Sequence, residues 1–224
     1  MLIFDMDDTL YESDAMRQVI LKKWHKFVIS KLKVKLGISQ VQAAALLEEE
    51  KQKITDEFQI VYLRKPTYTE MIERIAVDYR VSIKDWAKFK DTQINPKEYL
   101  SENPQLINTL EFLAGKYMLV LVSNNTDHQA KQILHALGIK DYRKYFRIFK
   151  TNARKPSTSV FEYVSRRLSV LAEQCVSIGD SYEKDIKPAL SLGMRGIHVS
   201  SHKEFMQITT TAAQKKQVFC GLIF

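Results

Sequence analysis

The sequence predicts an α/β protein, in which a doubly wound parallel sheet carries an inserted α-helical domain. Three features of the chain support this fold class. A short apolar run at 2–6 has the length and composition of a buried strand. The next stretch shows only helical periodicity. From Pro104 onward, strand and helix patterns alternate, which is typical of parallel sheets with right-handed crossovers.

The helical stretch divides the predicted sheet domain in the sequence. We expect 1–12 and 95–224 to form the α/β domain, and 13–94 to form a helical domain inserted after the first strand. The dipeptide Asn95-Pro96 breaks the helical pattern and marks the return to the sheet domain. A chain of 224 residues, of which 45% are hydrophobic and 27% charged, is typical of a globular protein.

The inserted domain is expected to contain four helices. Apolar residues at helical spacing define their length, and capping residues define their ends. Gly37 would end the first helix, and the pairs Ser39 with Gln42 and Thr67 with Glu70 would begin the second and third. The expected helices cover about 15–36, 41–54, 67–79 and a short segment around 85–86, which Ser82 would cap.

Four further strands are expected after Pro104, each separated from the next by a helix. The expected strands are 118–122, 145–149, 175–178 and 196–199. The expected helices are about 105–114, 127–137, one from after Pro156 to about 168, and a last one that ends near 192–193. The tail, 204–224, has a weak helical pattern and an apolar end, which would pack on the sheet or mediate self-association.

The composition excludes several classes of protein. No segment approaches the roughly 18 consecutive apolar residues of a membrane span. The chain passes from Met1 directly into the first strand, so we expect no signal peptide. The two cysteines, Cys175 and Cys220, provide no disulfide framework. We therefore expect a cytoplasmic protein. For its oligomeric state, we expect a monomer or a homodimer.

The net charge of +8 comes largely from the helical domain. Residues 13–94 contain 16 Lys and Arg against 11 Asp and Glu, and the six lysines between 22 and 35 meet no acid. Such a basic face can bind nucleic acid or attract anionic substrates. The sequence lacks the aromatic interleaving and the motifs of a nucleic-acid-binding module, so no nucleic-acid partner is expected. We favour a solvated helix face, with mild steering of anionic substrates as the second interpretation.

Three carboxylates follow the first strand within four positions: Asp5, Asp7 and Asp8. In an open α/β sheet, ligands bind beyond the carboxyl ends of the strands, where these acids would lie. Like charges this close repel each other and raise each other's pKa values unless a cation neutralises them. A hard divalent cation is the usual solution, so Asp5 and Asp7 are candidate metal-site residues. The alternative, an acidic surface turn, accounts for Asp8 but not for an Asp directly after a buried strand.

Polar residues at the strand ends together supply what phosphoryl transfer needs. Asp5 would be the nucleophile, because a carboxylate can form an aspartyl-phosphate and divide one difficult step into two. Asp7 would protonate the leaving alcohol and then activate water, provided that its surroundings raise its pKa. The hydroxyl of Ser123 and the backbone N–H of Asn124 would donate to phosphoryl oxygens at the end of the second strand.

Two later loops complete the candidate site. Lys155, held in an extended loop by the following proline, would neutralise the nucleophile and the developing charge. Asp180, directly after a buried strand, would complete a Mg²⁺ site with Asp5 and the backbone carbonyl of Asp7. Asp185, a helical turn further on, would support the metal or Lys155.

These motifs resemble those of the haloacid dehalogenase-like hydrolase superfamily, in family order and with family spacing. The segments that resemble the family's first to fourth motifs are, in order, Asp5-Met6-Asp7-Asp8-Thr9, Leu121-Val122-Ser123-Asn124, Lys155-Pro156, and Gly179-Asp180 with Asp185. The inserted helices lie where that family has its helical cap, so the resemblance covers essentially the whole chain. It implies a Rossmann-like core, a mobile cap, Mg²⁺ and mostly phosphatase activity, with Thr9 and Asp185 supporting the metal site. One departure is Lys184, which replaces the common Asn before Asp185.

The cap is expected to select the substrate, because the core motifs recognise only the phosphate. Tyr11 and the segment Tyr62-Leu63-Arg64 are similar to positions in the pyrimidine 5'-nucleotidase-like branch of the family. Arg64 would bind a second anionic or carbonyl group, and Tyr62 or Tyr68 would stack on a base. The alternative is that these tyrosines are ordinary core or interface residues of a helical bundle.

The resemblance thus predicts a Mg²⁺-dependent phosphatase of a small phosphorylated metabolite, with a nucleoside monophosphate as one candidate. Retention of Asp7 argues against a dehalogenase, because that branch of the family replaces this acid and needs no metal. A sugar-phosphate phosphomutase uses the same residues, so it remains an alternative. A second alternative is a nonenzymatic binding protein that uses the lysines at 22–35.

Overall fold

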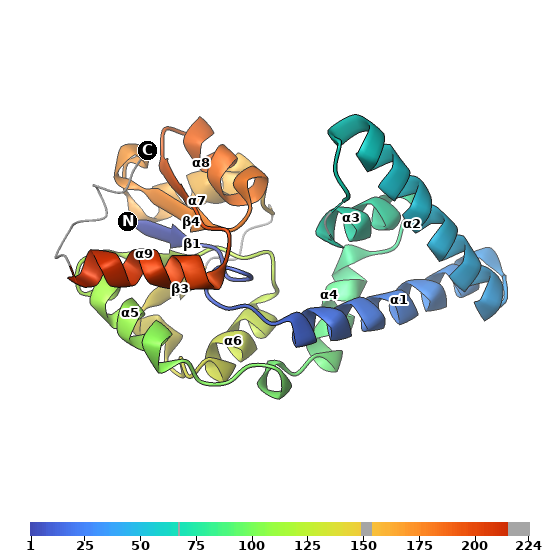
Figure 1. The fold of residues 1–224 in the computed structure, drawn as a ribbon, viewed down its shortest axis with the longest axis horizontal. Helices are drawn as coiled ribbons and strands as arrows, with labels where there is room; N and C mark the ends of the chain where they lie inside the picture. Colours follow the sequence, from blue (N-terminus) through green and yellow to red (C-terminus); the bar gives the residue numbers. More distant parts are fainter. Residues whose placement is uncertain (67, 149–153, 215–224) are drawn as a thin grey trace. The chain divides into compact units, whose positions relative to one another are not determined.

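The computed structural model describes residues 1–66, 68–148 and 154–214. The chain divides into two compact units, one formed by Met1–Asp14 with Pro96–Phe224 and the other by Ala15–Asn95. Figure 1 shows that the first unit contains the sheet and that the second consists of helices and their connections.

The first unit confirms the predicted α/β class, because its five-stranded sheet is parallel throughout. The strands lie in the order β3-β2-β1-β4-β5. They are β1 (Leu2–Phe4), β2 (Leu119–Leu121), β3 (Phe146–Ile148), β4 (Val176–Gly179) and β5 (Arg195–His198). The chain runs outward from β1 in both directions, so β1 lies at the topological switch point, where doubly wound sheets bind ligands.

Five α-helices cover this sheet in the part of the chain that the structure describes. They are α5 (Pro104–Ala114), α6 (Asp127–Ala136), α7 (Thr158–Leu168), α8 (Lys187–Ser191) and α9 (His202–Gln214), with 3₁₀ turns at Pro96–Glu98, Tyr142–Lys144 and Ala172–Gln174. Figure 1 shows α7 and α8 on one face and α5, α6 and α9 on the other. Right-handed crossovers on a doubly wound sheet produce this two-layered cover.

The strands bury side chains on both faces of the sheet. Ile3 packs with Phe161 of α7 in one hydrophobic cluster. Phe4 points to the opposite face, where its ring meets the edges of Phe146 and Phe205 at centroid distances of 6.0 and 5.9 Å. Burial on both faces explains why these strands have continuous apolar runs in the sequence rather than an alternating pattern.

One predicted helix differs in kind from the observed structure. The segment between the last two strands begins as a π-helical turn, η4 (Tyr182–Ile186), and only then continues as α8. The backbone N–H of Lys187 donates to the carbonyl of Tyr182, five residues earlier, which gives a wider turn than an α-helix has. Periodicity could not show this, since five residues are too few to distinguish the two helix types. The apolar end of the predicted tail, 218–224, lies outside the described residues.

The helical unit contains the four predicted helices. They are α1 (Asp14–Leu36), α2 (Gln40–Tyr62), α3 (Tyr68–Asp78) and α4 (Ile83–Gln93). The capping box of Ser39 with Gln42 is confirmed, as is the side-chain cap of Ser82, whereas Thr67 lies outside the described residues. Gly37, just after α1, has the left-handed φ of 65° expected of a helix C-terminus.

The second helix is longer than the sequence predicted. It continues eight residues beyond Ile54, which is buried, because no Gly or Pro interrupts the chain before Leu63 takes a left-handed conformation. The four helices enclose a core built around two tryptophans, Trp24 and Trp86, which are 2% and 7% exposed.

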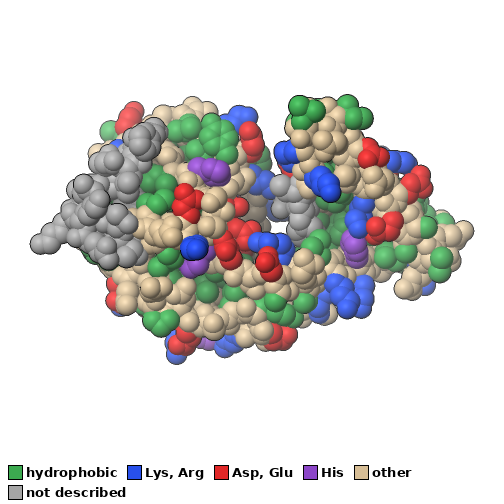
Figure 2. All heavy atoms as spheres, viewed as in Figure 1, with side chains coloured by type: hydrophobic (Ala, Val, Ile, Leu, Met, Phe, Trp, Pro, Cys, Tyr) green, Lys and Arg blue, Asp and Glu red, His purple; other side chains and the backbone are tan. Residues whose placement is uncertain are grey.

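The lysines between 22 and 35 lie on α1, most of them exposed. Lys31 approaches Asp85 at 3.8 Å, and Lys35 donates to the backbone carbonyl of Tyr79. Figure 2 shows Lys and Arg side chains interspersed with Asp and Glu on the visible face of the helical unit. The exposure of the lysines at 22–35 supports the interpretation as a solvated face. None of the described helices is long and apolar enough to cross a membrane.

Candidate active site

The loop after β1 folds back on itself and presents Asp5 and Asp7. The backbone N–H of Asp5 donates to the carbonyl of Ile178 in β4 at 2.9 Å, which fixes Asp5 at the carboxyl edge of the sheet. In the turn that follows, the N–H of Leu10 donates to the carbonyl four residues earlier. Asp8 adopts a left-handed φ of 59° in this turn, a conformation that Asp tolerates better than most residues.

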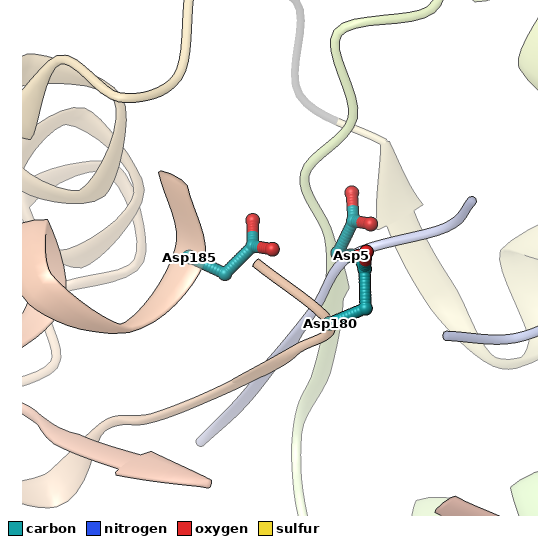
Figure 3. Close-up of side chains that lie close together, drawn as sticks. All are labelled: Asp5, Asp180 and Asp185. Carbon is teal, nitrogen blue, oxygen red and sulfur yellow. The ribbon is translucent and has the colours of Figure 1, made fainter. Parts of the chain in front are cut away.

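Three carboxylates meet at this edge: Asp5 after β1, Asp180 after β4 and Asp185 in η4. Each offers an oxygen, and these oxygens all lie within 4.8 Å of one another. Figure 3 shows the three side chains approaching each other from three separate segments of backbone. Carboxylate oxygens at this spacing fit a hard divalent cation such as Mg²⁺.

Lys155 lies against two of these carboxylates, Asp5 and Asp185. Its side chain is 4% exposed, and its Nζ donates to Oδ1 of Asp5 and Oδ1 of Asp185 at 2.5 Å each. Burial lowers the pKa of this lysine, but the two carboxylates outweigh burial and hold the pKa above its ordinary value. The ammonium therefore stays charged at neutral pH and neutralises part of the cluster.

Asn124 holds the backbone of Lys155 in place. Its side-chain Nδ2 donates to the carbonyl of Lys155 at 3.1 Å, and its Oδ1 accepts from the backbone N–H of Lys155 at 3.0 Å. The peptide bond between Lys155 and Pro156 is cis. The sequence assigned Asn124 a backbone role toward phosphate, and the structure adds that its side chain clamps the loop of the buried lysine.

The negative charge of the cluster exceeds its positive charge. Three carboxylates and one ammonium sum to −2 when all are ionised. Burial raises the pKa of Asp5 well above its usual range; Asp185 raises it further, while Lys155 opposes the shift. Burial also raises the pKa of Asp180 to about 6, with a further contribution from Asp185. A bound divalent cation would remove this excess charge.

Asp185 reaches the other carboxylates because residue 179 is a glycine. A Cβ at Gly179 would lie 2.5 Å from Cβ, Cγ and Oδ2 of Asp185. We expect Gly179→Ala to displace Asp185 and to weaken Mg²⁺ binding about 10-fold or more, which calorimetric titration would measure. Gly115→Ala is the matched control, because a Cβ there has ordinary contacts of 3.5 and 3.6 Å. Equal Mg²⁺ affinity in the two variants would contradict this expectation.

The carboxylate of Asp7 is held apart from these three acids by two hydrogen-bond donors. The hydroxyl of Tyr11 donates to Oδ1 at 2.5 Å. The side-chain Nδ2 of Asn125 lies 3.0 Å from Oδ1 and 2.8 Å from Oδ2. Asp7 thus lies two residues from Asp5 in sequence but is oriented by residues of its own, which suits a role in proton transfer rather than in metal binding through its side chain.

Two predicted residues of the first two motifs have other contacts. The hydroxyl of Ser123 accepts from the backbone N–H of Asn125 at 3.1 Å. Thr9 is fully buried, and its carbonyl accepts from Nδ1 of His202 at 3.1 Å. Among the described residues, the hydroxyl of Thr9 has no hydrogen-bond partner.

The predicted substrate-binding residues of the helical unit form a small cluster of their own. The guanidinium of Arg64 makes two hydrogen bonds to the carboxylate of Glu70, at 2.9 and 2.7 Å. Its Cζ lies over the rings of Phe58 and Tyr62 at 5.5 and 5.7 Å. Tyr62 is 58% exposed and is therefore not a core residue. The side chain of Tyr68 lies outside the described part of the chain.

Sequence reasoning missed the side-chain roles of Asn124 and Asn125 and the contact of Tyr11 with Asp7. A signal was present in each case. Two consecutive asparagines directly follow a buried strand, and Tyr11 lies four residues after Asp7 in a turn. The asparagine signal identifies no partner, since Asn125 and Asp7 are 118 positions apart.

The sequence was compared with protein families and with curated proteins. Residues 1–193 match the family model described as haloacid dehalogenase-like hydrolase. Over 206 residues the chain is 26% identical to a glyceraldehyde 3-phosphate phosphatase of Methanopyrus kandleri, an alignment that covers 90% of this chain and 84% of that protein. Over 208 residues it is 27% identical to a glyceraldehyde 3-phosphate phosphatase of Methanocaldococcus jannaschii, covering 90% of this chain and 85% of that one.

The fold was compared with solved structures. The crystal structure of a HAD phosphatase from Thermococcus onnurineus matches with a TM-score of 0.51 at 25% sequence identity. The match covers 88% of this chain and 85% of the other.

Proposed function

This chain belongs to the haloacid dehalogenase-like hydrolase family, and from that premise we propose that it is a Mg²⁺-dependent phosphatase with Asp5 as nucleophile. It is a hydrolase of phosphoric monoesters, in agreement with the phosphatases that it is similar to. One observation carries the catalytic proposal. Asp5, Asp180, Asp185 and Lys155 converge at the carboxyl edge of the sheet with an excess of negative charge.

The chemistry of this cluster supports Mg²⁺ as the cofactor. Asp5, Asp180 and Asp185 offer the hard oxygen ligands that Mg²⁺ prefers, and their spacing leaves room for one shared ion. Bound there, Mg²⁺ would supply positive charge to the phosphoryl oxygens. We also propose the backbone carbonyl of Asp7 as a ligand of this Mg²⁺ ion.

In the proposed mechanism, a carboxylate oxygen of Asp5 attacks the phosphorus atom. The bond between phosphorus and the leaving oxygen breaks as the bond to Asp5 forms, and a proton passes from Asp7 to the departing alcohol. Water then attacks the aspartyl-phosphate and gives a proton back to Asp7, which releases inorganic phosphate and restores Asp5. Lys155, whose ammonium contacts Asp5, stabilises the charge that develops. Ser123 is the proposed donor to a phosphoryl oxygen.

For the substrate, we propose a small phosphorylated metabolite. The two curated relatives act on glyceraldehyde 3-phosphate by name, which makes triose and sugar phosphates the first candidates. A nucleoside monophosphate is the second candidate, supported by the exposed ring of Tyr62 and by Arg64 beside it. We propose that the helical unit acts as the cap that makes this choice, since the core motifs contact only the phosphate.

The test is phosphate release from a panel of triose phosphates, sugar phosphates and nucleoside monophosphates, with Mg²⁺ and with EDTA. Release that needs Mg²⁺ would support the proposal, and its ranking across the panel would identify the substrate class. Equal release in EDTA would overturn the proposal that Mg²⁺ is the cofactor. If the folded protein released no phosphate, the proposal of phosphatase activity would be overturned. Phosphate exchange within a sugar phosphate without release would favour the phosphomutase.

Mg²⁺ is expected to stabilise the protein more at neutral than at acidic pH. Asp180 has a pKa of about 6 in the fold against an ordinary value of 3.8. An acid whose pKa is higher in the folded than in the unfolded protein stabilises the fold fully at pH values below its pKa in the unfolded state. This contribution is lost as the pH rises through its pKa in the folded state. Mg²⁺ binds the ionised carboxylates, so it should raise the thermal midpoint more at about pH 7.5 than at about pH 5. Scanning fluorimetry would show this, and Asp180→Asn should reduce the difference. A Mg²⁺ effect that is independent of pH would contradict the expectation.

A further inference from the structure

The carboxylate of Asp7 is oriented by two hydrogen-bond donors. Two loops from neighbouring strands hold it. Tyr11 follows β1, and Asn125 follows β2, which pairs with β1 in parallel. Neither Tyr11 nor Asn125 has a role in the mechanism described so far.

The two oxygens of Asp7 are held unequally. Oδ1 accepts from the Tyr11 hydroxyl at 2.5 Å and lies 3.0 Å from Nδ2 of Asn125. Oδ2 lies 2.8 Å from the same Nδ2, which is its sole donor among the described residues. A carboxylate oxygen has two lone pairs. Oδ1 therefore has both lone pairs occupied, and Oδ2 has one available for a proton.

Both donors are themselves fixed. Tyr11 is buried, at 6% exposure, and its hydroxyl donates to Oδ1 of Asp7. The backbone N–H of Asn125 donates to the hydroxyl of Ser123, which holds the start of this loop. The orientation of the Asp7 carboxylate is thus determined from two sides.

We propose that Tyr11 and Asn125 are positioning residues for general acid catalysis, and that they orient Asp7 so that Oδ2 carries the transferred proton. This inference rests on the proposed function. In the first step, the proton moves from Oδ2 of Asp7 to the leaving oxygen while the bond from that oxygen to phosphorus breaks. In the second step, Oδ2 accepts a proton from the attacking water. Loss of either donor leaves the nucleophile, Asp5, and its contact with Lys155 in place.

The dependence of the rate on the leaving group tests this role. An aryl phosphate such as p-nitrophenyl phosphate releases a stable phenolate and needs little help from a general acid. An alkyl phosphate such as glycerol 3-phosphate must have its leaving oxygen protonated. The measured quantity is the ratio of kcat/KM for the aryl phosphate to kcat/KM for the alkyl phosphate, in the presence of Mg²⁺. A variant that merely loosens the site lowers both values and leaves the ratio unchanged.

The variants are Tyr11→Phe and Asn125→Ala, with Asp7→Asn as the reference for complete loss of the acid. We expect each positioning variant to raise the ratio about 10-fold and Asp7→Asn to raise it further. Tyr145→Phe is the matched control, because the hydroxyl of Tyr145 also donates to a carboxylate, that of Glu111 at 3.0 Å, on the surface of the same unit. Its ratio should equal that of the wild type.

The outcomes separate this inference from the proposed function. Unchanged ratios in both positioning variants, with an active wild-type enzyme, would overturn the positioning role and leave the phosphatase intact. A wild-type protein that hydrolyses neither ester would overturn both. Because the two substitutions lie on different loops, a folding defect in one variant leaves the other to decide the question.

Discussion

Asp5→Asn is expected to lower phosphate release by at least about 1000-fold, because an amide cannot form the aspartyl-phosphate. The same substitution should leave the protein folded. Burial raises the pKa of Asp5 well above its usual range, so the ionised carboxylate is costly to bury at neutral pH. An amide of the same shape carries no charge and relieves the repulsion from Asp185 and Asp7. Steady-state phosphate release and thermal unfolding in EDTA would measure the two effects.

The control for this variant is Asp141→Asn. Asp141 is exposed and caps a 3₁₀ turn of the same unit, where its Oδ1 accepts from the backbone N–H of Arg143. It should retain wild-type activity. Trapping the wild-type enzyme during turnover should add one phosphoryl group to Asp5, as seen by mass spectrometry. Substantial turnover by Asp5→Asn would show that another group is the nucleophile.

The largest loss of stability is expected from Lys155→Met. Removing this ammonium leaves Asp5 and Asp185 buried without the cation that contacts both. Breaking a buried ion pair by removing one partner costs about 3–5 kcal/mol of unfolding free energy. Denaturant unfolding in EDTA would measure the loss. Activity should also fall, since the same ammonium stabilises the charge that develops on the phosphoryl group.

Two further variants test whether the loss arises from uncompensated charge. In Lys155→Met with Asp185→Asn, one buried carboxylate is also removed, so part of the lost stability should return. Lys131→Met is the matched control, because Lys131 pairs with Asp127 at 2.6 Å on the exposed surface of α6 and should contribute little. An equal effect of Lys155→Met and Lys131→Met would contradict the importance of the buried ammonium.

The sequence alone was sufficient to predict the fold class, the order of the elements and the residues that carry charge at the strand ends. These properties depend on local patterns. A parallel strand buried on both faces is a short apolar run, and an acid directly after it has to lie at the carboxyl edge of the sheet. Local pattern therefore places both Asp5 and Asp180 at one edge of the sheet.

Local pattern was not sufficient for helix ends that tertiary packing determines. The extension of α2 to Tyr62 follows from the absence of Gly and Pro before Leu63, whereas the π-helical turn before α8 depends on what the backbone packs against. The turn matters for the site, because it contains Asp185, whose carboxylate passes over Gly179. The sequence placed Asp185 as a supporting residue, whereas its carboxylate lies within the same group as Asp5 and Asp180.

The contacts between loops were decided by the tertiary structure alone. Lys155 and Asp5 are 150 positions apart, and Asn125 is 118 positions from Asp7. A residue type and a position after a strand show that a polar group is available at the edge of the sheet. They do not show which neighbour it will contact. The side-chain direction in each loop is set by packing and by hydrogen bonds across the strand order β2-β1-β4. For this reason the sequence determined which residues are candidates for the site, and the fold determined that Asn124 holds the lysine and that Tyr11 and Asn125 hold Asp7.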